Sequence, residues 1–393
     1  MSKPIKVLHF IPTLTSGGAE RQLVNLVTST SRELLEHIVC TISKPEFFAP
    51  AVRDAGYEIV DLGIEQKRPV LRAAMAFRSV VAKYKPDIVH SWLYDANVSA
   101  RLATIFFRHI PVVTSLQNPD YEPDVARAAN WNPAKVVRLR QLDKLAATLK
   151  PTHFVACSEF VKKSFQQYLG ISDERATVIY NSVNPETLQS RPGQAEGLRR
   201  SLGLPQDAFI ILNVGRLDPQ KNHSLMFEGL KLAALAMPNA HLLLAGAGPL
   251  EAALRTKAKD TGVGERVLFL GRRDDIPALL EAADVFLFPS HFEGLPVALI
   301  EAMYKGLAVI TSRNEILSEV VDDGRTGLLV DPNSADDLAD ALVKLHSQPD
   351  LRKSLGTAAR EEAIIRFSVA ATIAKWESLY RMIHNKKKGS WSF

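Results

Sequence analysis

The chain has 393 residues, of which 46% are hydrophobic, and this is more than one hydrophobic core usually serves. We therefore expect a globular protein with two domains and no long disordered tract. The net charge is +5, an excess too small to indicate nucleic acid, and no nucleic-acid partner is expected.

The sequence offers no sign of export or of a disulfide framework. The apolar run from Lys3 to Ile11 is too short and too punctuated for a signal peptide, and no stretch approaches the roughly 18 apolar residues of a membrane span. Cys40 and Cys157 lie far apart in strand-like runs, which predicts reduced core residues. We expect a cytoplasmic protein, at most peripheral at the inner membrane face.

Basic residues gather in two places. The run Lys386 to Lys388 lies near the end of the chain, and a second group precedes the middle, formed by Lys135, Arg138, Arg140 and Lys144. A solvated surface explains both groups, but so does attraction to an anionic membrane or an anionic acceptor. If the second group lines one helix face, that face should bind anionic vesicles.

The chain alternates short apolar runs with helical patterns, twice over. The runs are continuously apolar, which is typical of strands buried on both faces of a parallel sheet. A polar segment at 184–203 interrupts the pattern. We therefore predict an α/β protein of two Rossmann-like parallel-sheet domains, 1–184 and 185–366, facing a central cleft, with a helix and a basic tail at 367–393. Ligands should bind beyond the carboxyl ends of the strands.

Paired glycines, Gly17 and Gly18, follow the first predicted strand and open a helix. Glycines let the backbone approach a ligand, and the free amides of a helix start favour an anion such as a diphosphate. A tight turn without a ligand would look the same. The third glycine of a dinucleotide fingerprint and the Gly-Lys-Ser/Thr of a P-loop are missing.

Two cations, Arg216 and Lys221, follow Gly215 in one loop after the first strand of the second domain. A departing diphosphate needs positioned cations to neutralise its growing charge, although two surface cations would also fit the pattern. The loops after the next two strands contain Gly248 and Arg273. They offer close backbone approach and polar groups for a nucleobase, or they are simple turns.

The strongest signal is the segment 288–303, which contains Glu293 and Glu301. We expect Gly294 to start a helix on which Glu301 lies about two turns in. Glu293 can then reach a sugar, while the amides of Gly294 and Leu295 can hold hydroxyls or phosphate. Glu301 can accept hydrogen bonds from ribose hydroxyls, and its apolar neighbours make its burial costly without a partner.

These segments resemble the retaining glycosyltransferases called group 1 or family four. The resemblance covers nearly the whole chain and is most specific in three motifs: Gly215-Arg216-Leu217 through Lys221-Asn222, Gly246-Ala247-Gly248-Pro249, and Glu293 to Glu301. It implies the GT-B fold, with the acceptor held mainly by the first domain and the nucleotide-sugar, expected to be a UDP-sugar, by the second. It also implies that the last helix crosses back onto the first domain.

The resemblance implies roles for single residues. Arg216 and Lys221 would hold the donor diphosphate, and Glu293 would position the transferred sugar. Glu301 would bind ribose. Gly18 would approach the phosphates, and backbone near Arg273 would contact the base.

Two motifs depart from the family pattern. Gln117, followed by Asn118, stands where many relatives have a histidine; it can hydrogen-bond an acceptor sugar but cannot act as a base. The Gly-Gly-x-x-Glu motif keeps Glu319 but lacks the glycines. His90, at the end of a predicted strand, is either an acceptor contact or a plain strand residue.

We therefore expect a retaining glycosyltransferase that moves a sugar from a nucleotide-sugar to a saccharide or lipid-linked saccharide in cell-surface polysaccharide biosynthesis. No cofactor and no obligatory metal are expected, because the acidic pairs 274–275 and 322–323 are interpreted as turn or helix-start residues. A nucleotide-sugar 2-epimerase of the same architecture and a non-catalytic nucleotide-sugar-binding protein remain alternatives. Consumption of nucleotide-sugar without an acceptor would favour the epimerase.

Overall fold

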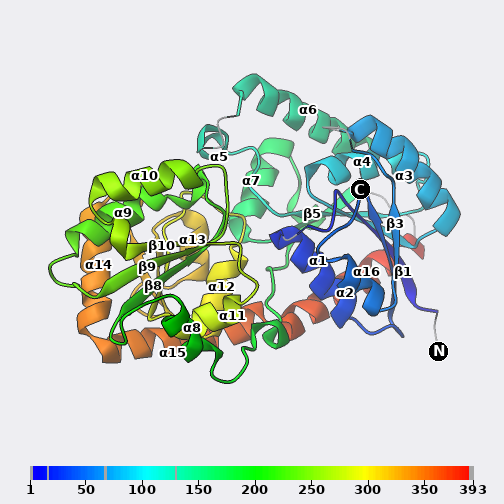
Figure 1. Ribbon diagram of the computed structural model, residues 1–393. Helices are drawn as coiled ribbons and strands as arrows, with labels where there is room; N and C mark the ends of the chain where they lie inside the picture. The colour runs from blue at the N-terminus through cyan, green and yellow to red at the C-terminus, as the bar shows by residue number, and fades with distance from the viewer. Residues whose placement is uncertain (1–2, 16, 66–68, 129–130, 389–393) are drawn as a thin grey trace. The chain divides into compact units, whose positions relative to one another are not determined.

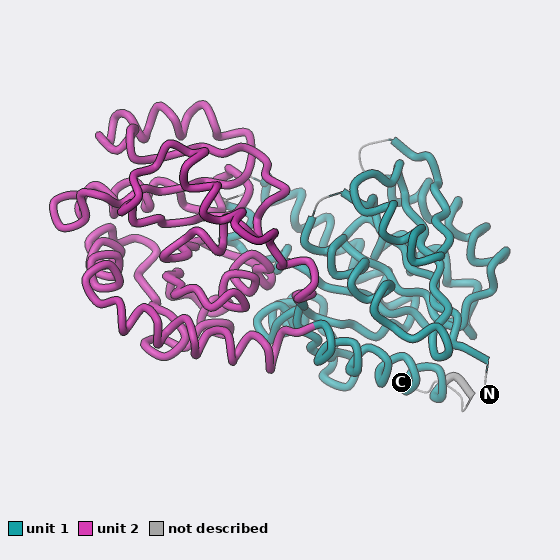
Figure 2. Tube along the Cα trace, turned by 60° about the horizontal axis from the view of Figure 1, so that its bottom comes forward, with its two compact units in different colours: residues 1–182, 369–393 teal, residues 183–368 magenta. Residues whose placement is uncertain are grey.

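The computed structural model describes residues 3–15, 17–65, 69–128 and 131–388. The chain divides into two compact units, residues 1–182 with 369–393 and residues 183–368 (Figure 2). These limits fall within a few residues of those expected from the sequence. The last helix, α16 (Val369–Lys388), belongs to the first unit.

The first unit, in which Figure 1 labels β1, β3 and β5, is built on a parallel sheet with the strand order β3-β2-β1-β4-β5-β6-β7. Its strands are β1 (Ile5–Ile11), β2 (Leu35–Thr41), β3 (Glu58–Asp61), β4 (Ile88–Trp92), β5 (Val112–Leu116), β6 (Thr152–Ala156) and β7 (Ala176–Val178). The order reverses at β1, which pairs with both β2 and β4. Such a switch point is where open α/β sheets bind ligands.

Helices cover both faces of this sheet. They are α1 (Gly18–Ser29), α2 (Ala49–Asp54), α3 (Val70–Tyr84), α4 (Tyr94–Thr104), α5 (Pro123–Ala128), α6 (Pro133–Leu149), α7 (Glu159–Leu169) and α16, with a 3-10 turn, η1 (Asp173–Arg175). Alternate residues of β1 enter different cores, since successive side chains of a strand point to opposite faces. Val7 packs in the core of α1 and α16, whereas Leu8 packs in the core of α3 and α4.

The apolar stripe of the last helix docks on the first sheet. Trp376, Leu379, Tyr380 and Ile383 are buried in the same core as Val7, and Ile373 packs against that core. The expectation that this stripe must dock on protein is therefore confirmed. Cys40 and Cys157 are both buried cysteines outside any disulfide, as expected.

The second unit repeats the architecture with the strand order β10-β9-β8-β11-β12-β13. Its strands are β8 (Phe209–Val214), β9 (Ala240–Ala245), β10 (Val267–Gly271), β11 (Val285–Phe288), β12 (Ala308–Ser312) and β13 (Leu328–Val330). All neighbouring pairs are parallel. The predicted architecture of two parallel α/β sheets is confirmed.

The helices of the second unit alternate with these strands. They are α8 (Gln194–Ser201), α9 (His223–Leu232), α10 (Glu251–Thr261), α11 (Ile276–Ala282), α12 (Val297–Tyr304), α13 (Glu315–Val320), α14 (Ala335–Ser347) and α15 (Pro349–Phe367), with the 3-10 turns η2 (Pro185–Leu188), η3 (Pro219–Lys221) and η4 (Gly264–Arg266). One large core joins the sheet to α9 and α14.

Candidate functional site

Three glycine loops meet at the carboxyl ends of β8, β9 and β10. The amide of Gly215 donates to the carbonyl of Ala245 at 3.0 Å, and the amide of Gly246 donates to that of Gly271 at 2.8 Å. A Cβ on Gly246 would lie 1.8 Å from the carbonyl oxygen of Gly215, and the φ of Gly246 is +154°. A Cβ on Gly248 would lie 2.2 Å from the carbonyl oxygen of Leu217. Backbone contact between these loops therefore requires glycine.

Lys221 and Glu293 form an ion pair on neighbouring loops. The Lys221 Nζ lies 2.6 Å from Glu293 Oε1, and the side chains are only 13% and 9% exposed. The same ammonium lies 4.6 Å from the ring centroid of Phe288. Gln220 fastens the two loops, because its side-chain amide donates to the carbonyl of Phe292 at 2.8 Å. A preorganised cation therefore lies beyond the carboxyl ends of β8 and β11, next to Gly215.

The other two predicted cations of this unit differ in their surroundings. The side chain of Arg216 is 70% exposed, with a long contact of 3.9 Å to Asp218. Arg273 is paired in two places with Asp275, at 2.8 and 2.6 Å. The Arg273 hydrogen bond holds the pKa of the Asp275 carboxyl below its usual value. Arg216 is thus open to a ligand, whereas the Arg273 side chain is engaged and only its backbone suits the predicted base contact.

One expectation for the segment 288–303 is wrong. Gly294 does not start the helix, because α12 begins at Val297. Gly294 and Leu295 are buried in the loop that precedes it. Pro296, the residue before the helix, is extended, and a proline disfavours helical backbone at the residue that precedes it, here Leu295. Glu301 therefore lies in the second turn of a short helix, buried with only 5% of its surface exposed.

Asn314 holds the loop of Glu293, a role that the sequence interpretation missed. Its side-chain oxygen accepts a hydrogen bond from the amide of Leu317 at 2.9 Å and caps α13. Its side-chain nitrogen donates to the carbonyl of Ser290 at 3.1 Å. The Asn-x-x preceding a short apolar run is an N-cap signal and could have identified this residue. The segment that lacks the family's glycines thus still supports the loop of Glu293.

The glycine pair of the first unit lies beside the buried carboxyl of Glu20. Gly17 is the N-cap of α1, and Gly18 is its first residue. A Cβ on Gly17 would lie 2.2 Å from an oxygen of Glu20, and Thr15 donates a hydrogen bond to Glu20 at 3.1 Å. Burial raises the pKa of Glu20. The predicted phosphate loop therefore has an acidic group within it, which the sequence interpretation did not consider.

The expectation that His90 ends its strand is wrong. β4 continues to Trp92, and His90 is fully buried within it. Its Nδ1 lies 2.7 Å from the hydroxyl of Tyr380, and its Nε2 lies 2.8 Å from that of Ser115. Both ring nitrogens therefore already have protein partners. The plain strand histidine is the interpretation that these contacts support.

Gln117 and Asn118 follow β5, half-buried and exposed respectively. Three residues beyond Gln117 the same loop reaches Asp120, which lines a cavity of about 360 Å³. The lining also includes Tyr94 and Asp95 at the start of α4, Trp131, and one side of α6. These residues were missed because the cavity depends on α6 packing beside α4, which no local pattern reveals.

The residues 3–15, 17–65, 69–128 and 131–388 contain no group of three or more His, Cys, Asp or Glu that could hold a metal ion. Of the acidic pairs noted in the sequence, Asp275 binds Arg273, and Asp323 binds Arg313 at 2.8 Å. Within the same residues, no helix has the length and apolarity needed to cross a membrane.

Two family models match the chain. The one described as "Glycosyltransferase Family 4" matches residues 16–187, and "Glycosyl transferases group 1" matches residues 194–362. Together they span both units. The chain belongs to glycosyltransferase family four.

Among similar glycosyltransferases is the UDP-Gal:alpha-D-GlcNAc-diphosphoundecaprenol alpha-1,3-galactosyltransferase of Escherichia coli. It is 27% identical over 320 residues, which are 80% of this chain and 81% of the relative. The D-inositol 3-phosphate glycosyltransferase of Corynebacterium glutamicum is 34% identical over 216 residues, covering 53% of this chain and 51% of the relative.

Solved glycosyltransferases share the fold. Anabaena HepE in complex with UDP-glucose superposes with a TM-score of 0.81 and 21% identity, covering 96% of this chain and all of that one. WaaG, a glycosyltransferase involved in lipopolysaccharide biosynthesis, gives 0.75 and 19%, covering 95% of this chain and 99% of that one. This glycosyltransferase therefore has the GT-B fold expected from the sequence.

Proposed function

We propose that this glycosyltransferase moves a hexose from a UDP-sugar to a lipid-linked saccharide, with retention of the anomeric configuration and without an obligatory metal. The observation that carries the proposal is the Lys221–Glu293 pair beyond the ends of β8 and β11. It combines a cation for a diphosphate with a carboxylate for a sugar at the loops where parallel sheets bind ligands.

The mechanism rests on charge that grows as the donor breaks. As the bond between the sugar and the diphosphate lengthens, negative charge accumulates on the phosphate oxygens. Lys221 is preorganised and largely shielded from water. It therefore stabilises the transition state, in which this charge is larger, more than it stabilises the bound donor. Arg216, which is exposed, can close onto the same phosphates. These cations supply positive charge that would otherwise require a metal.

Retention follows if the leaving phosphate takes the acceptor's proton on the face from which it departs. The acceptor hydroxyl then attacks that same face of an oxocarbenium-like sugar, and no protein nucleophile is needed. Glu293 accepts hydrogen bonds from hydroxyls of the transferred sugar and orients it. Gln117 cannot act as a base, so this route suits the residue present.

The choice of donor and acceptor is supported by the relatives. The Escherichia coli galactosyltransferase is named for UDP-Gal and for GlcNAc-diphosphoundecaprenol, and structural neighbours were solved with UDP or UDP-glucose. WaaG acts in lipopolysaccharide biosynthesis. We accordingly propose that this enzyme acts in the assembly of a cell-surface polysaccharide, in the cytoplasm.

A peripheral membrane location is part of the proposal, but its basis differs from the one expected. The four basic residues of α6 do not share a face, because a helix turns about 100° per residue. Lys135 lines a cavity, and Arg140 lies 5.6 Å from the ring centroid of Tyr168. Arg138 and Lys144 are exposed.

Apolar side chains accompany these two cations on the surface of α6. Val137, Leu145 and Leu149 are 40%, 53% and 49% exposed. The acidic residue of this helix, Asp143, is buried. A helix surface that combines exposed apolar and basic side chains suits an anionic lipid surface.

The proposed transfer is tested with purified protein and UDP-galactose, UDP-glucose or UDP-N-acetylglucosamine, with GlcNAc-diphosphoundecaprenol as acceptor and mass spectrometry as the readout. One hexose added in the presence of EDTA is expected. A parallel thermal-shift series with UDP, GDP and ADP should raise the melting temperature with UDP alone. An unchanged melting temperature with every nucleotide would contradict the assignment of a donor site. Donor consumption without acceptor would indicate an epimerase instead.

The membrane part is tested by sedimentation with vesicles. Binding to vesicles containing phosphatidylglycerol should be strong at low salt and fall as salt screens the attraction. The variant Arg138→Ala/Lys144→Ala should bind less, and the matched variant Lys257→Ala/Lys259→Ala in the second unit should not. Equal binding to neutral vesicles would contradict the electrostatic mechanism.

A further inference from the structure

The first unit contains a cavity of about 360 Å³ beyond the carboxyl ends of β4 and β5. It is lined by Val70, Tyr94, Asp95, Asp120, Tyr121, Trp131, Lys135, Val136, Leu139 and Leu142. Its size falls within the range of roughly 300 to 1,000 Å³ typical of ligand sites. The lining is mainly apolar and aromatic, with a few polar groups, which is the composition of a site that orients a small molecule.

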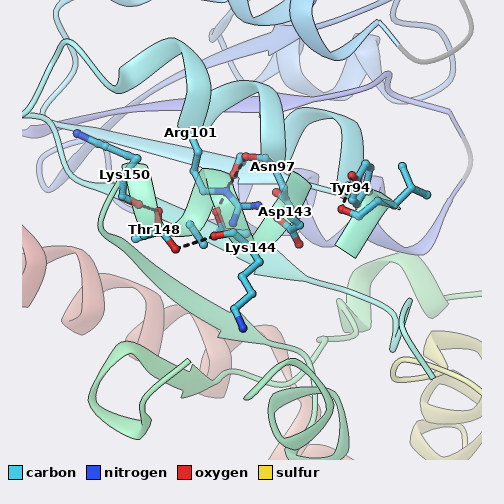
Figure 3. Close-up of polar contacts among 12 residues, drawn as sticks. Tyr94, Asn97, Arg101, Asp143, Lys144, Thr148 and Lys150 are labelled. Carbon is cyan, nitrogen blue, oxygen red and sulfur yellow. Dashed lines mark hydrogen bonds and ion pairs between the residues drawn. The ribbon is translucent and has the colours of Figure 1, made fainter. Parts of the chain in front are cut away.

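The walls of this cavity are fixed by a buried ion pair. Arg101 of α4, whose side chain is fully buried, pairs with Asp143 of α6 (Figure 3). The hydroxyl of Tyr121 donates to the other oxygen of Asp143 at 2.6 Å. The hydroxyl of Tyr94 donates to the carbonyl of Leu139 at 2.8 Å. Helix α4, helix α6 and the loop after β5 are thus held together, so the cavity is preorganised.

The polar groups of the cavity suit sugar hydroxyls. Asp95 and Asp120 bring carboxyl groups, which accept hydrogen bonds from hydroxyls. Burial, and secondarily the charge of Asp143, raises the pKa of Asp120 to about 7. Near neutral pH this carboxyl can therefore accept or donate. The rings of Tyr94 and Trp131 offer apolar surfaces for the C–H face of a pyranose.

A second hollow adjoins the first. It measures about 320 Å³ and is lined by Asn132, Ala134, Lys135, Arg138 and Leu139. Lys135 and Leu139 border both hollows. The Lys135 ammonium lies 5.6 Å from the ring centroid of Trp131. The Lys135 ammonium therefore lies between the aromatic cavity and the second hollow. The other charged group of the second hollow is the exposed Arg138.

We propose that the two hollows together bind a glycosyl phosphate, with the sugar in the aromatic cavity and the phosphate on Lys135 and Arg138. The sugar places its hydroxyls on Asp95 and Asp120, and the phosphate at its anomeric carbon reaches the two cations. This inference rests on the proposed function, because a sugar joined to phosphate is the head group of a lipid-linked acceptor. It assigns the acceptor's recognition to residues of the first unit alone.

The test is isothermal titration calorimetry on the full chain with saturating UDP, which occupies the donor site. The probes are N-acetyl-α-D-glucosamine 1-phosphate, the methyl α-glycoside of N-acetylglucosamine, and inorganic phosphate. The sugar phosphate should bind about tenfold more tightly than either fragment, since charge-assisted hydrogen bonds add to the sugar contacts. Lys135→Ala/Arg138→Ala should remove the advantage over the methyl glycoside.

Two neighbouring valines give a matched pair of variants. Val136 lines the cavity, whereas Val137 is 40% exposed and does not. Val136→Trp should fill the cavity and reduce binding of the sugar phosphate at least tenfold, and Val137→Trp should leave it unchanged. Thermal unfolding checks that each variant is folded. If Val136→Trp does not fold, the Lys135→Ala/Arg138→Ala pair decides.

Three results would overturn the inference: no binding of the sugar phosphate, equal binding by both tryptophan variants, or inorganic phosphate binding as tightly as the sugar phosphate. Its failure is distinguishable from that of the proposed function. Intact transfer by Val136→Trp would contradict this acceptor site and leave the proposed function standing. Sugar phosphate binding that is lost in Val136→Trp, together with no transfer by the wild type, would support this site and contradict the proposed function.

Discussion

The Nζ of Lys221 lies 2.6 Å from Oε1 of Glu293, and neither side chain is more than 13% exposed. In the absence of a donor, each charge is therefore the other's partner. Under the proposed function, a donor diphosphate would meet a cation that is already in place, because the Glu293 carboxylate holds the ammonium out of solvent. The ion pair therefore fixes the position of the Lys221 ammonium before the reaction, as electrostatic preorganisation requires.

Lys221→Ala should lower kcat by roughly a hundredfold or more while raising the donor KM much less, because the charge on the diphosphate grows during bond breaking. Steady-state kinetics with the transfer assay measures both. Lys305→Ala, which removes another partly buried lysine of the same unit from its pair with Glu281, is the control and should leave both constants unchanged. Near-normal turnover of Lys221→Ala at saturating donor would contradict the assignment.

Glu301→Gln should act differently from Lys221→Ala. If Glu301 binds ribose, its contacts change little between the bound donor and the transition state, so the donor KM should rise and kcat should stay close to that of the wild type. Calorimetric titration with UDP should show the same loss of affinity. Abolished turnover with unchanged UDP affinity, in a folded protein, would show that Glu301 takes part in the chemistry.

The sequence was sufficient for the fold because its signals are local and repeated. Buried strands such as β8 are continuous apolar runs, and glycines such as Gly246 follow them where backbones must touch. The ion pair of Lys221 with Glu293 joins residues 72 positions apart. Its members could be named from motifs, but their direct contact depends on how two loops pack.

The cavity of the first unit could not be predicted in this way. Asp143 looks like an ordinary surface residue of a helix rich in basic side chains, and only the packing of α6 on α4 buries it against Arg101. His90 was misplaced by a similar cause. A strand end is set by pairing with its neighbours, and β4 pairs with β5 as far as Trp92.

Asp143→Ala should destabilise the first unit by ~3 to 5 kcal/mol, because it leaves the buried guanidinium of Arg101 without its countercharge. The four tryptophans all belong to residues 1–182 and 369–393, so urea unfolding followed by tryptophan fluorescence reports on this unit. Asp124→Ala, which breaks an exposed pair with Arg127, should cost less than ~1 kcal/mol. Equal effects of the two variants would contradict the importance of burial.

Acid should destabilise the first unit through its buried histidines. Burial lowers the pKa of His37 to about 3 and holds those of His9 and His90 well below the usual value. Below pH ~6.5 the unfolded chain binds protons that the folded unit does not. The free energy of unfolding therefore decreases as the pH is lowered, by up to ~1.4 kcal/mol per pH unit for each histidine. This loss should continue down to about pH 4.

The comparison of variants isolates that effect from the carboxyl groups. His37→Gln should flatten the fall in unfolding free energy between pH 6.5 and 4, whereas His109→Gln, at an exposed position, should reproduce the wild-type curve. Urea unfolding by tryptophan fluorescence at several pH values provides the curves. Parallel curves for His37→Gln and the wild type would show that His37 is protonated in the folded unit.

The most direct test of the central claim is the anomeric configuration of the product. The enzyme is incubated with a UDP-α-hexose and GlcNAc-diphosphoundecaprenol, and the new linkage is assigned by the proton coupling at the anomeric carbon in NMR spectra. We predict an α-linked hexose, formed by the wild type and strongly reduced in Lys221→Ala. A β-linked product, or transfer that does not depend on Lys221, would contradict a retaining reaction driven by the cation of the second unit.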